Sequence, residues 1–255
     1  MTSPFSAKSA YFDRVATGVW KKVIDFGKAK KSREEAARSV IGRQIEATLC
    51  PGMTLPPAFE SLFRWIEKNG YFVDVQDRRI GILFSERLKK ESWTDTGRRG
   101  GTDIEFAAEG DVNLRYWFQS ENPEIMNRLC VFAKTGAEGS RAAFWLADDG
   151  SQKIVHLGSG SGSTTLCVLA DDPVDFLRLL AIGYDEICWG QEFSAPPNAS
   201  GEFVVEPNHA FAEWVSKTFE VDIPKRGSEI VKNHARMEDA EADDLFWRWV
   251  RKHVG

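Results

Sequence analysis

The middle of the chain carries a series of short, apolar runs that constrain its fold more than any other feature. Eight such runs lie between residues 71 and 170. In chain order they are YFVDV, RIGILF, TDIEFAA, VNLRYWF, RLCVFAK, AAFWLAD, KIVHLG and TTLCVLA. Turn-forming residues separate several of them at short intervals, which is typical of antiparallel neighbours. The sequence therefore predicts a mostly antiparallel sheet.

Helix-like segments flank these runs. Pro56 and Pro57 open the first, PPAFESLFRWIEKNG, and proline suits a first helical turn. Further helices are expected over residues 173–184, in NHAFAEWVSKTF, and in DAEADDLFWRWVRKHV at residues 239–254. Trp247 and Trp249 are two residues apart in the last helix, so we expect one of them to be partly exposed. The expected fold class is α+β: a mostly antiparallel central sheet flanked by helices, with N-terminal and C-terminal helical additions.

A breaker, LCPGMTLPP, divides the chain near Met53. We expect residues 1–53 to form an N-terminal helical extension, in which Ser32 and Glu35 make a capping-box pattern. Residues 54–255 are then the α+β domain with its C-terminal helices.

The most noticeable local motif is LGSGSGSTTL, residues 157–166. It lacks the lysine of a P-loop, the third glycine of a dinucleotide-binding fingerprint and the serine of a nucleophile elbow. It also leads into an apolar strand-like run, whereas phosphate-binding loops lead into a helix N-terminus. We interpret it as a flexible connection between two strands.

Histidines and cysteines give no sign of a metal or catalytic site. The four histidines show no metal-binding spacing, and we expect His156 to point outward from its strand. The four cysteines form no C-x-x-C pair and fit buried free thiols in a reducing compartment. The first residues, MTSPFSAKSAYFDR, contain no apolar segment after a basic start, so the expected location is the cytoplasm. No run is long and apolar enough to cross a bilayer, so no membrane partner is expected.

Charge is unevenly distributed along the chain. Residues 1–53 carry a net charge of +5, and the remainder carries −10. An acidic domain repels the phosphate backbone of nucleic acid and attracts a basic protein partner. The alternative is that the acidic surface only keeps the protein in solution.

The helix and strand segments together resemble a known family. Leu55-Pro56, Phe59, Leu62-Phe63 and Asn69-Gly70 resemble the opening of SUKH domains. AAFWLADDGSQKIVHLGSGSG resembles the strand, Asp-Gly turn and strand of that family, and TTLCVLADDPVDFLRLLAIGYDEI its next strand and closing helix. The resemblance covers about residues 54–190, and the first 53 residues and the C-terminal helices are additional to it.

Members of the SUKH superfamily are chiefly immunity proteins that bind and neutralise toxins, often nucleases or deaminases, deployed between bacteria. The resemblance therefore implies a cognate protein toxin as partner, no cofactor and no catalysis. Occlusion of the toxin's active site would be the mechanism. Two alternatives remain: a hydrolase or transferase whose dispersed site has the Gly-Ser loop as a lid, and a regulatory scaffold that binds peptides.

Acids at the ends of the central strands and of the following helix are the expected partner-binding residues, because clustered acids repel one another and favour a basic partner. They are Asp148, Asp149, Asp171, Asp172, Asp185, Glu186 and Glu192, the last of which lies beyond Trp189. Trp189 itself is included as an interface aromatic. The competing interpretation is that Asp149 serves a turn and Asp172 a helix cap.

Overall fold

The computed structural model describes residues 38–201 and 203–254 of the chain. Its α-helices are α2 (Val40–Glu46), α3 (Pro57–Lys68), α4 (Glu86–Glu91), α5 (Leu114–Phe118), α6 (Pro123–Met126), α7 (Pro173–Ile182), α8 (His209–Phe219) and α9 (Leu245–His253). Two short 3-10 helices are η1 (Gly190–Ser194) and η2 (Gly227–Glu229).

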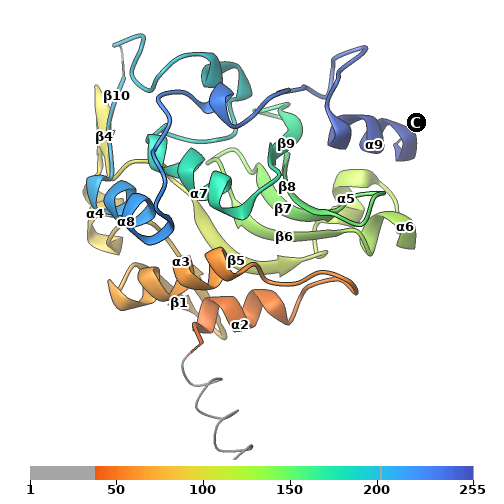
Figure 1. The fold of residues 1–255 in the computed structure, drawn as a ribbon, viewed down its shortest axis with the longest axis horizontal. Coiled ribbons are helices and arrows are strands. Elements are labelled where there is room, and N and C mark those ends of the chain that lie inside the picture. Colours follow the sequence, from red (N-terminus) through yellow and green to blue (C-terminus); the bar gives the residue numbers. More distant parts are fainter. Residues whose placement is uncertain (1–37, 202, 255) are drawn as a thin grey trace, which may run out of the picture. The chain divides into compact units, whose positions relative to one another are not determined.

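A seven-stranded sheet runs through the centre of the fold (Figure 1), in the order β1-β2-β5-β6-β7-β8-β9. Its strands are β1 (Phe72–Val75), β2 (Arg78–Gly81), β5 (Glu105–Gly110), β6 (Leu129–Lys134), β7 (Arg141–Leu146), β8 (Gln152–Leu157) and β9 (Leu166–Ala170). Every neighbouring pair is antiparallel. The predicted α+β class with a mostly antiparallel sheet is confirmed.

A smaller sheet lies beside the large one. It joins β3 (Trp93–Thr94), β4 (Gly97–Arg99) and β10 (Val204–Glu206), and β10 runs parallel to β4. This pairing brings β10, which directly precedes α8, against a strand that precedes β5. It places Arg98 of β4 next to the residues that follow α7.

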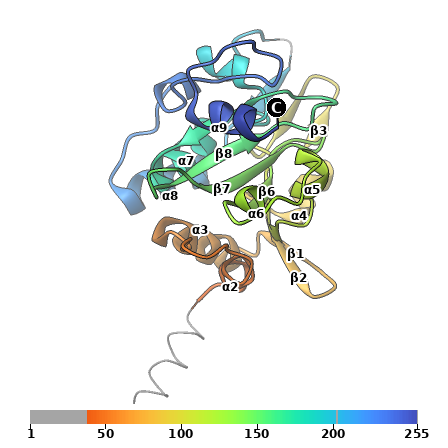
Figure 2. The ribbon, with the colours of Figure 1, turned by 90° about the vertical axis from the view of Figure 1, so that its right-hand side faces the viewer.

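Helices cover both faces of the large sheet, so its central strands β6, β7 and β8 are buried on two sides. Along β7, Phe144 joins the apolar cluster that contains the buried residues of α3 and α7, and Trp145 joins the cluster that contains those of α5, α6 and α9. Figure 2 shows α7 and α8 on one side of the sheet and α5 and α6 on the other. Strands buried on both faces read as continuous apolar runs, as these do.

Helix α3 supplies the centre of the larger cluster. Pro57 occupies its first turn, as predicted, and its stripe of apolar residues is buried. The ring of Phe59 lies 5.0 Å from those of Phe132 and Phe144 in the sheet and 5.7 Å from that of Phe176 in α7. The predicted helices at 173–184 and 208–219 are confirmed as α7 and α8.

Three expectations about local structure need correction. VNLRYWF is a helix, α5, because its buried residues Leu114 and Phe118 stand four apart, which is a helical spacing. The last helix starts at Leu245 instead of Asp239, since Asp244 caps its N-terminus. Trp247 and Trp249 are both buried, because residues 235–237 cover one flank of the helix.

The compact unit starts at Ser39, ahead of the boundary that the sequence suggested near Met53. Ile41 and Ile45 of α2 are fully buried in the larger apolar cluster. Residues 1–37 of the predicted extension, including the capping-box residues Ser32 and Glu35, lie outside the described residues.

Candidate partner-binding site

The structure separates the predicted site residues into two groups at opposite ends of the central strands. Asp148 and Asp149 lie in the turn between β7 and β8, and Asp171 and Asp172 follow the end of β9 beside it. Asp185, Glu186, Trp189 and Glu192 follow α7 and lie at the other end, where Glu186 contacts the β6–β7 connection. Six residues of β7 separate the two ends by about 20 Å. The eight residues therefore do not form one face.

The first group has structural partners throughout. Asp148 pairs with Arg128 at 2.8 Å, Asp149 accepts from Ser151 N at 2.9 Å, Asp171 pairs with Lys153 at 2.6 Å, and Asp172 accepts from Val174 N at 2.6 Å. The hydrogen bonds from Ser151 lower the pKa of Asp149. Asp149 thus closes a turn and Asp172 caps α7, which agrees with the competing interpretation of these two residues.

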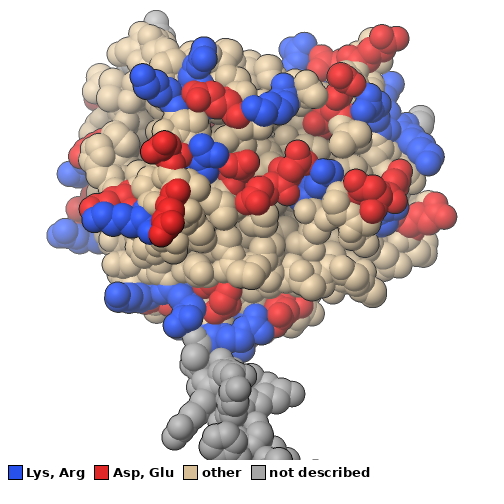
Figure 3. All heavy atoms as spheres, viewed as in Figure 1, with Lys and Arg blue, Asp and Glu red and all other residues tan. Residues whose placement is uncertain are grey.

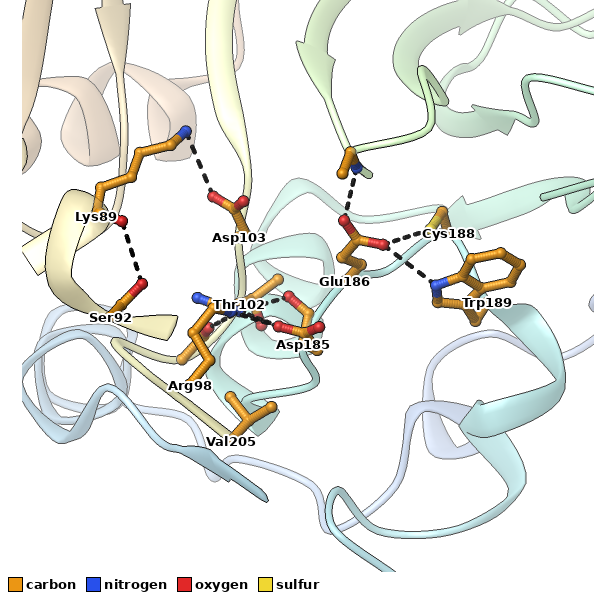
Figure 4. Close-up of polar contacts among 12 residues, drawn as sticks. Lys89, Ser92, Arg98, Thr102, Asp103, Asp185, Glu186, Cys188, Trp189 and Val205 are labelled. Carbon is orange, nitrogen blue, oxygen red and sulfur yellow. Dashed lines mark hydrogen bonds and ion pairs between the residues drawn. The ribbon is translucent and has the colours of Figure 1, made fainter. Parts of the chain in front are cut away.

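In the second group, Asp185 is held by a buried arginine (Figure 4). Nε of Arg98 donates to Asp185 Oδ1 at 2.5 Å, and Nη2 donates to the backbone oxygens of Gly101 and Asp185 at 2.5 and 2.9 Å. The Arg98 side chain has no exposed surface, whereas that of Asp185 is 28% exposed. The carboxylate of Asp185 therefore pairs with a buried guanidinium and is itself partly exposed to solvent.

Glu186 is almost completely buried and organises the neighbouring residues. Its Oε1 accepts from the backbone N of Ala137 at 2.6 Å, and its Oε2 accepts from the indole of Trp189 at 3.2 Å and from the Cys188 thiol at 3.4 Å. Glu186 is therefore a positioning residue for Trp189, and it adds fixed negative charge beneath the surface. Burial, followed by the charge of Glu186, raises the pKa of Cys188, so this thiol stays protonated.

Asp185, Trp189 and Glu192 line one surface pocket of about 360 Å³. Most of the other lining residues are apolar or aromatic, among them Tyr184, Pro196, Pro197, Phe203 and Val205, whereas Asn198 and Ser200 are polar. Asn198 braces the wall, because its side chain exchanges hydrogen bonds with N and O of Val205 at 2.8 and 2.9 Å. The structure thus brings three of the predicted residues, Asp185, Trp189 and Glu192, together in one pocket that combines carboxylates with aromatic rings.

Partial burial, and after it the charges of Asp185 and Glu186, raise the pKa of Glu192. A raised pKa means that the surroundings of Glu192 disfavour its ionised, negatively charged form. Asp185 and Glu192 are the two carboxylates that line the pocket, and Asp185 pairs with Arg98. A cation that enters the pocket would therefore stabilise the ionised form of Glu192.

Figure 3 shows acidic and basic side chains intermixed on the face viewed there. The net charge of the chain is −5.

Residue His156, expected to point outward, is fully buried. Its Nδ1 lies 2.8 Å from the carbonyl oxygen of Thr165 and its Nε2 lies 2.9 Å from the hydroxyl of Thr135. A carbonyl only accepts, so Nδ1 carries the proton and the Thr135 hydroxyl donates to Nε2. Burial lowers the pKa of His156 to about 4, which makes the ring neutral at pH 7. The hydroxyl–imidazole–carbonyl order resembles a catalytic relay, but His156 and Thr135 are both closed off from any substrate.

The Gly-Ser loop connects β8 to β9, as predicted. It is tied down more firmly than a flexible connection: Ser163 is buried and its hydroxyl donates to Cys188 O at 2.5 Å. Ser159 N also donates to the Ser140 hydroxyl at 3.1 Å. The loop therefore braces the segment that carries Glu186 and Trp189.

Sequence reasoning missed Arg98, Tyr184 and the pocket wall formed by residues 195–200, 203 and 205. The hydroxyl of Tyr184 donates to Ala195 O at 2.6 Å and accepts from Gly227 N at 2.8 Å, so it holds two loops together under the pocket. Arg98 stands in the run GRRGG, which carries no sign that its partner lies beyond α7. Only the tertiary fold reveals these contacts.

Among the described residues, no cluster of histidine, cysteine, aspartate and glutamate is arranged to hold a metal ion, and no helix is long and apolar enough to span a membrane. The four cysteines are free, and three of them are buried. Comparisons of the chain with protein-family models, curated proteins and solved structures found no match.

Proposed function

We propose that the protein is a non-catalytic immunity protein that binds a cognate antibacterial toxin and occludes its active site. The observation that carries this proposal is the pocket in which Asp185 and Glu192 lie beside Trp189. Aromatic rings next to carboxylates suit a basic protein surface, since they supply large contact area together with charge complementarity. Membership of the SUKH superfamily and a cytoplasmic location belong to the same proposal.

Electrostatics support a basic partner. Residues 54–255 carry a net charge of −10, and two carboxylates, those of Asp185 and Glu192, line the pocket. A toxin that acts on nucleic acid presents a basic surface to the phosphates of its substrate. A pocket of fixed carboxylates competes for that surface and speeds the encounter of the two proteins.

Rigidity also supports a binding role. Glu186 fixes Trp189, Arg98 fixes Asp185, and Asn198 fixes the opposite wall. A preorganised pocket loses little conformational entropy when a partner docks, which favours tight binding.

The test has two stages. In the first, the wild-type chain and the variants Glu192→Lys and Glu213→Lys are used to capture proteins from the source organism. Glu213 is an exposed glutamate of α8 away from the pocket lining, so its reversal is the matched control. The relevant partner is retained by the wild type and the control and lost with Glu192→Lys.

In the second stage, the captured protein is expressed alone and together with the chain in a laboratory bacterium. The proposal predicts that it arrests growth alone and that the wild-type chain restores growth. A captured protein that is harmless, or whose toxicity the chain leaves unchanged, would refute the immunity function.

A further inference from the structure

The pocket lined by Asp185, Trp189 and Glu192 contains carboxylate oxygens to which no described residue donates. Arg98 donates to Oδ1 of Asp185, and no described residue donates to Oδ2. Glu192 is exposed at the surface, and its carboxylate forms no hydrogen bond or ion pair with another described residue. The four acids at the other end of β7, by contrast, are all engaged. The two carboxylates of the pocket are therefore open to donors from a partner.

Aromatic side chains line the same pocket. Trp189 and Phe203 contribute rings, and a hydrogen bond from its indole at 3.2 Å fixes the first of them. The same combination of groups already holds one guanidinium inside the fold. Arg98 donates to Asp185, and its Cζ lies 5.4 Å from the ring centroid of Trp93. A guanidinium pairs with carboxylates and packs on aromatic rings at the same time.

The size and the rim of the pocket favour a side chain of a protein over a free small molecule. Its volume of about 360 Å³ is near the lower end of the range for small-molecule sites, about 300–1,000 Å³. Outside the lining, the ring of Trp93 lies 5.7 Å from that of Phe203 and is 53% exposed. Tryptophan is enriched among the residues that dominate protein interfaces. A protein whose side chain fills the pocket would also cover Trp93.

We propose that this pocket takes one arginine side chain of the partner protein. The guanidinium donates to the carboxylates of Asp185 and Glu192, and its flat face packs on the aromatic lining. Its five N–H donors suit several open oxygens better than the compact, strongly hydrated ammonium group of lysine does. This arginine belongs to the toxin of the proposed function, on which the inference rests.

Titration of the full chain with capped amino acids tests the pocket without the toxin. The probes are N-acetyl-argininamide, N-acetyl-lysinamide and N-acetyl-citrullinamide, which has the shape of arginine without its charge. Nuclear magnetic resonance of the labelled indole N–H groups follows binding, and Trp189→Phe assigns the resonance of Trp189. We expect the arginine probe to shift this resonance and to bind about threefold more tightly than the lysine probe. The citrulline probe should leave the resonance in place.

A variant that keeps Trp189 and Asp185 gives the second measurement. Glu192→Gln should weaken binding of the arginine probe about fivefold, as expected for a solvent-exposed ion pair. Glu213→Gln removes the same charge from α8, outside the pocket lining, and should leave binding unchanged. The proposal is overturned if the arginine probe does not bind, if the lysine or the citrulline probe binds as tightly, or if Glu192→Gln binds like the wild type.

The titrations and the growth test fail separately. A toxin that the chain neutralises, together with an arginine probe that leaves Trp189 unmoved, would overturn the arginine site and leave the immunity function standing. A captured protein that is harmless would overturn the immunity function, and with it the toxin as the source of the arginine, whatever the probes show of the pocket.

Discussion

The guanidinium of Arg98 lies wholly inside the protein and donates to the carboxylate of Asp185, 87 residues further along the chain, at 2.5 Å. Asp185 in turn lines the pocket that holds Trp189 and Glu192. The same carboxylate thus compensates a buried charge and contributes to the proposed binding surface. Stability and partner binding are coupled at this residue, and experiments have to separate the two.

Removing the charge of Asp185 should destabilise the fold. Asp185→Asn leaves the buried Arg98 without a counter-charge, and we expect the free energy of unfolding to fall by about 3 kcal/mol. Asp175→Asn is the control, since Asp175 pairs with Arg178 near the surface and should cost less than about 1 kcal/mol. Urea denaturation measures both, and equal effects of the two variants would contradict a buried pair at Asp185.

Stability should also fall in mild acid because of His156. Its pKa is about 4 in the folded protein, against about 6.5 in the unfolded chain. Below pH 6.5 the unfolded chain therefore binds a proton that the folded protein does not. This difference lowers the free energy of unfolding progressively down to about pH 4, by about 3 kcal/mol in total.

Urea denaturation of the wild type and of His156→Gln between pH 7 and pH 4 isolates this effect. Glutamine does not titrate, so the variant should lose the part of the pH dependence that His156 contributes. Parallel pH profiles of the wild type and the variant would show that the pKa of His156 does not differ between the folded and the unfolded protein.

Asp244 should stabilise the fold more than an ordinary helix cap. Its Oδ1 accepts from Trp247 N at 2.8 Å and its Oδ2 accepts from Val168 N in β9 at 2.9 Å. Asp244→Ala removes the cap of α9 and the acceptor of a strand N–H together, at a cost of about 2–3 kcal/mol. Asp172→Ala, which removes only the exposed cap of α7, should cost about 1 kcal/mol. Thermal unfolding of the two variants measures these losses of stability. Equal losses would show that the hydrogen bond from Val168 N in β9 to Asp244 contributes nothing to stability.

Local patterns were sufficient to predict the elements whose signals are strong. Pro57 and the apolar stripe predicted α3. Of the eight apolar runs predicted to be strands, seven overlap strands of the large sheet. The prediction of a strand at VNLRYWF was wrong, because the composition of this run is typical of a strand. Only the spacing of the buried residues Leu114 and Phe118 indicates the helix.

The candidate site was harder to predict, because it depends on which ends of the strands lie together. Asp148 and Asp185 look equivalent in the sequence, as acids that follow a strand or a helix. They lie at opposite ends of β7 in the structure. His156 was misplaced for a related reason: helices cover both faces of the sheet, so the alternation that marks an outward residue is absent.

The separation of the two acidic groups allows a direct test of the central claim, that the pocket at Asp185, Trp189 and Glu192 binds a basic toxin. The measurement is the association rate of the captured toxin with the wild type, with Glu192→Lys and with Asp148→Lys, as a function of salt. Asp148 is an exposed acid at the opposite end of β7, so its reversal changes the net charge equally. We expect Glu192→Lys to slow association about tenfold at low salt and to flatten its salt dependence, while Asp148→Lys leaves both near the wild type. Equal rates for Glu192→Lys and the wild type, or equal slowing by both variants, would contradict it.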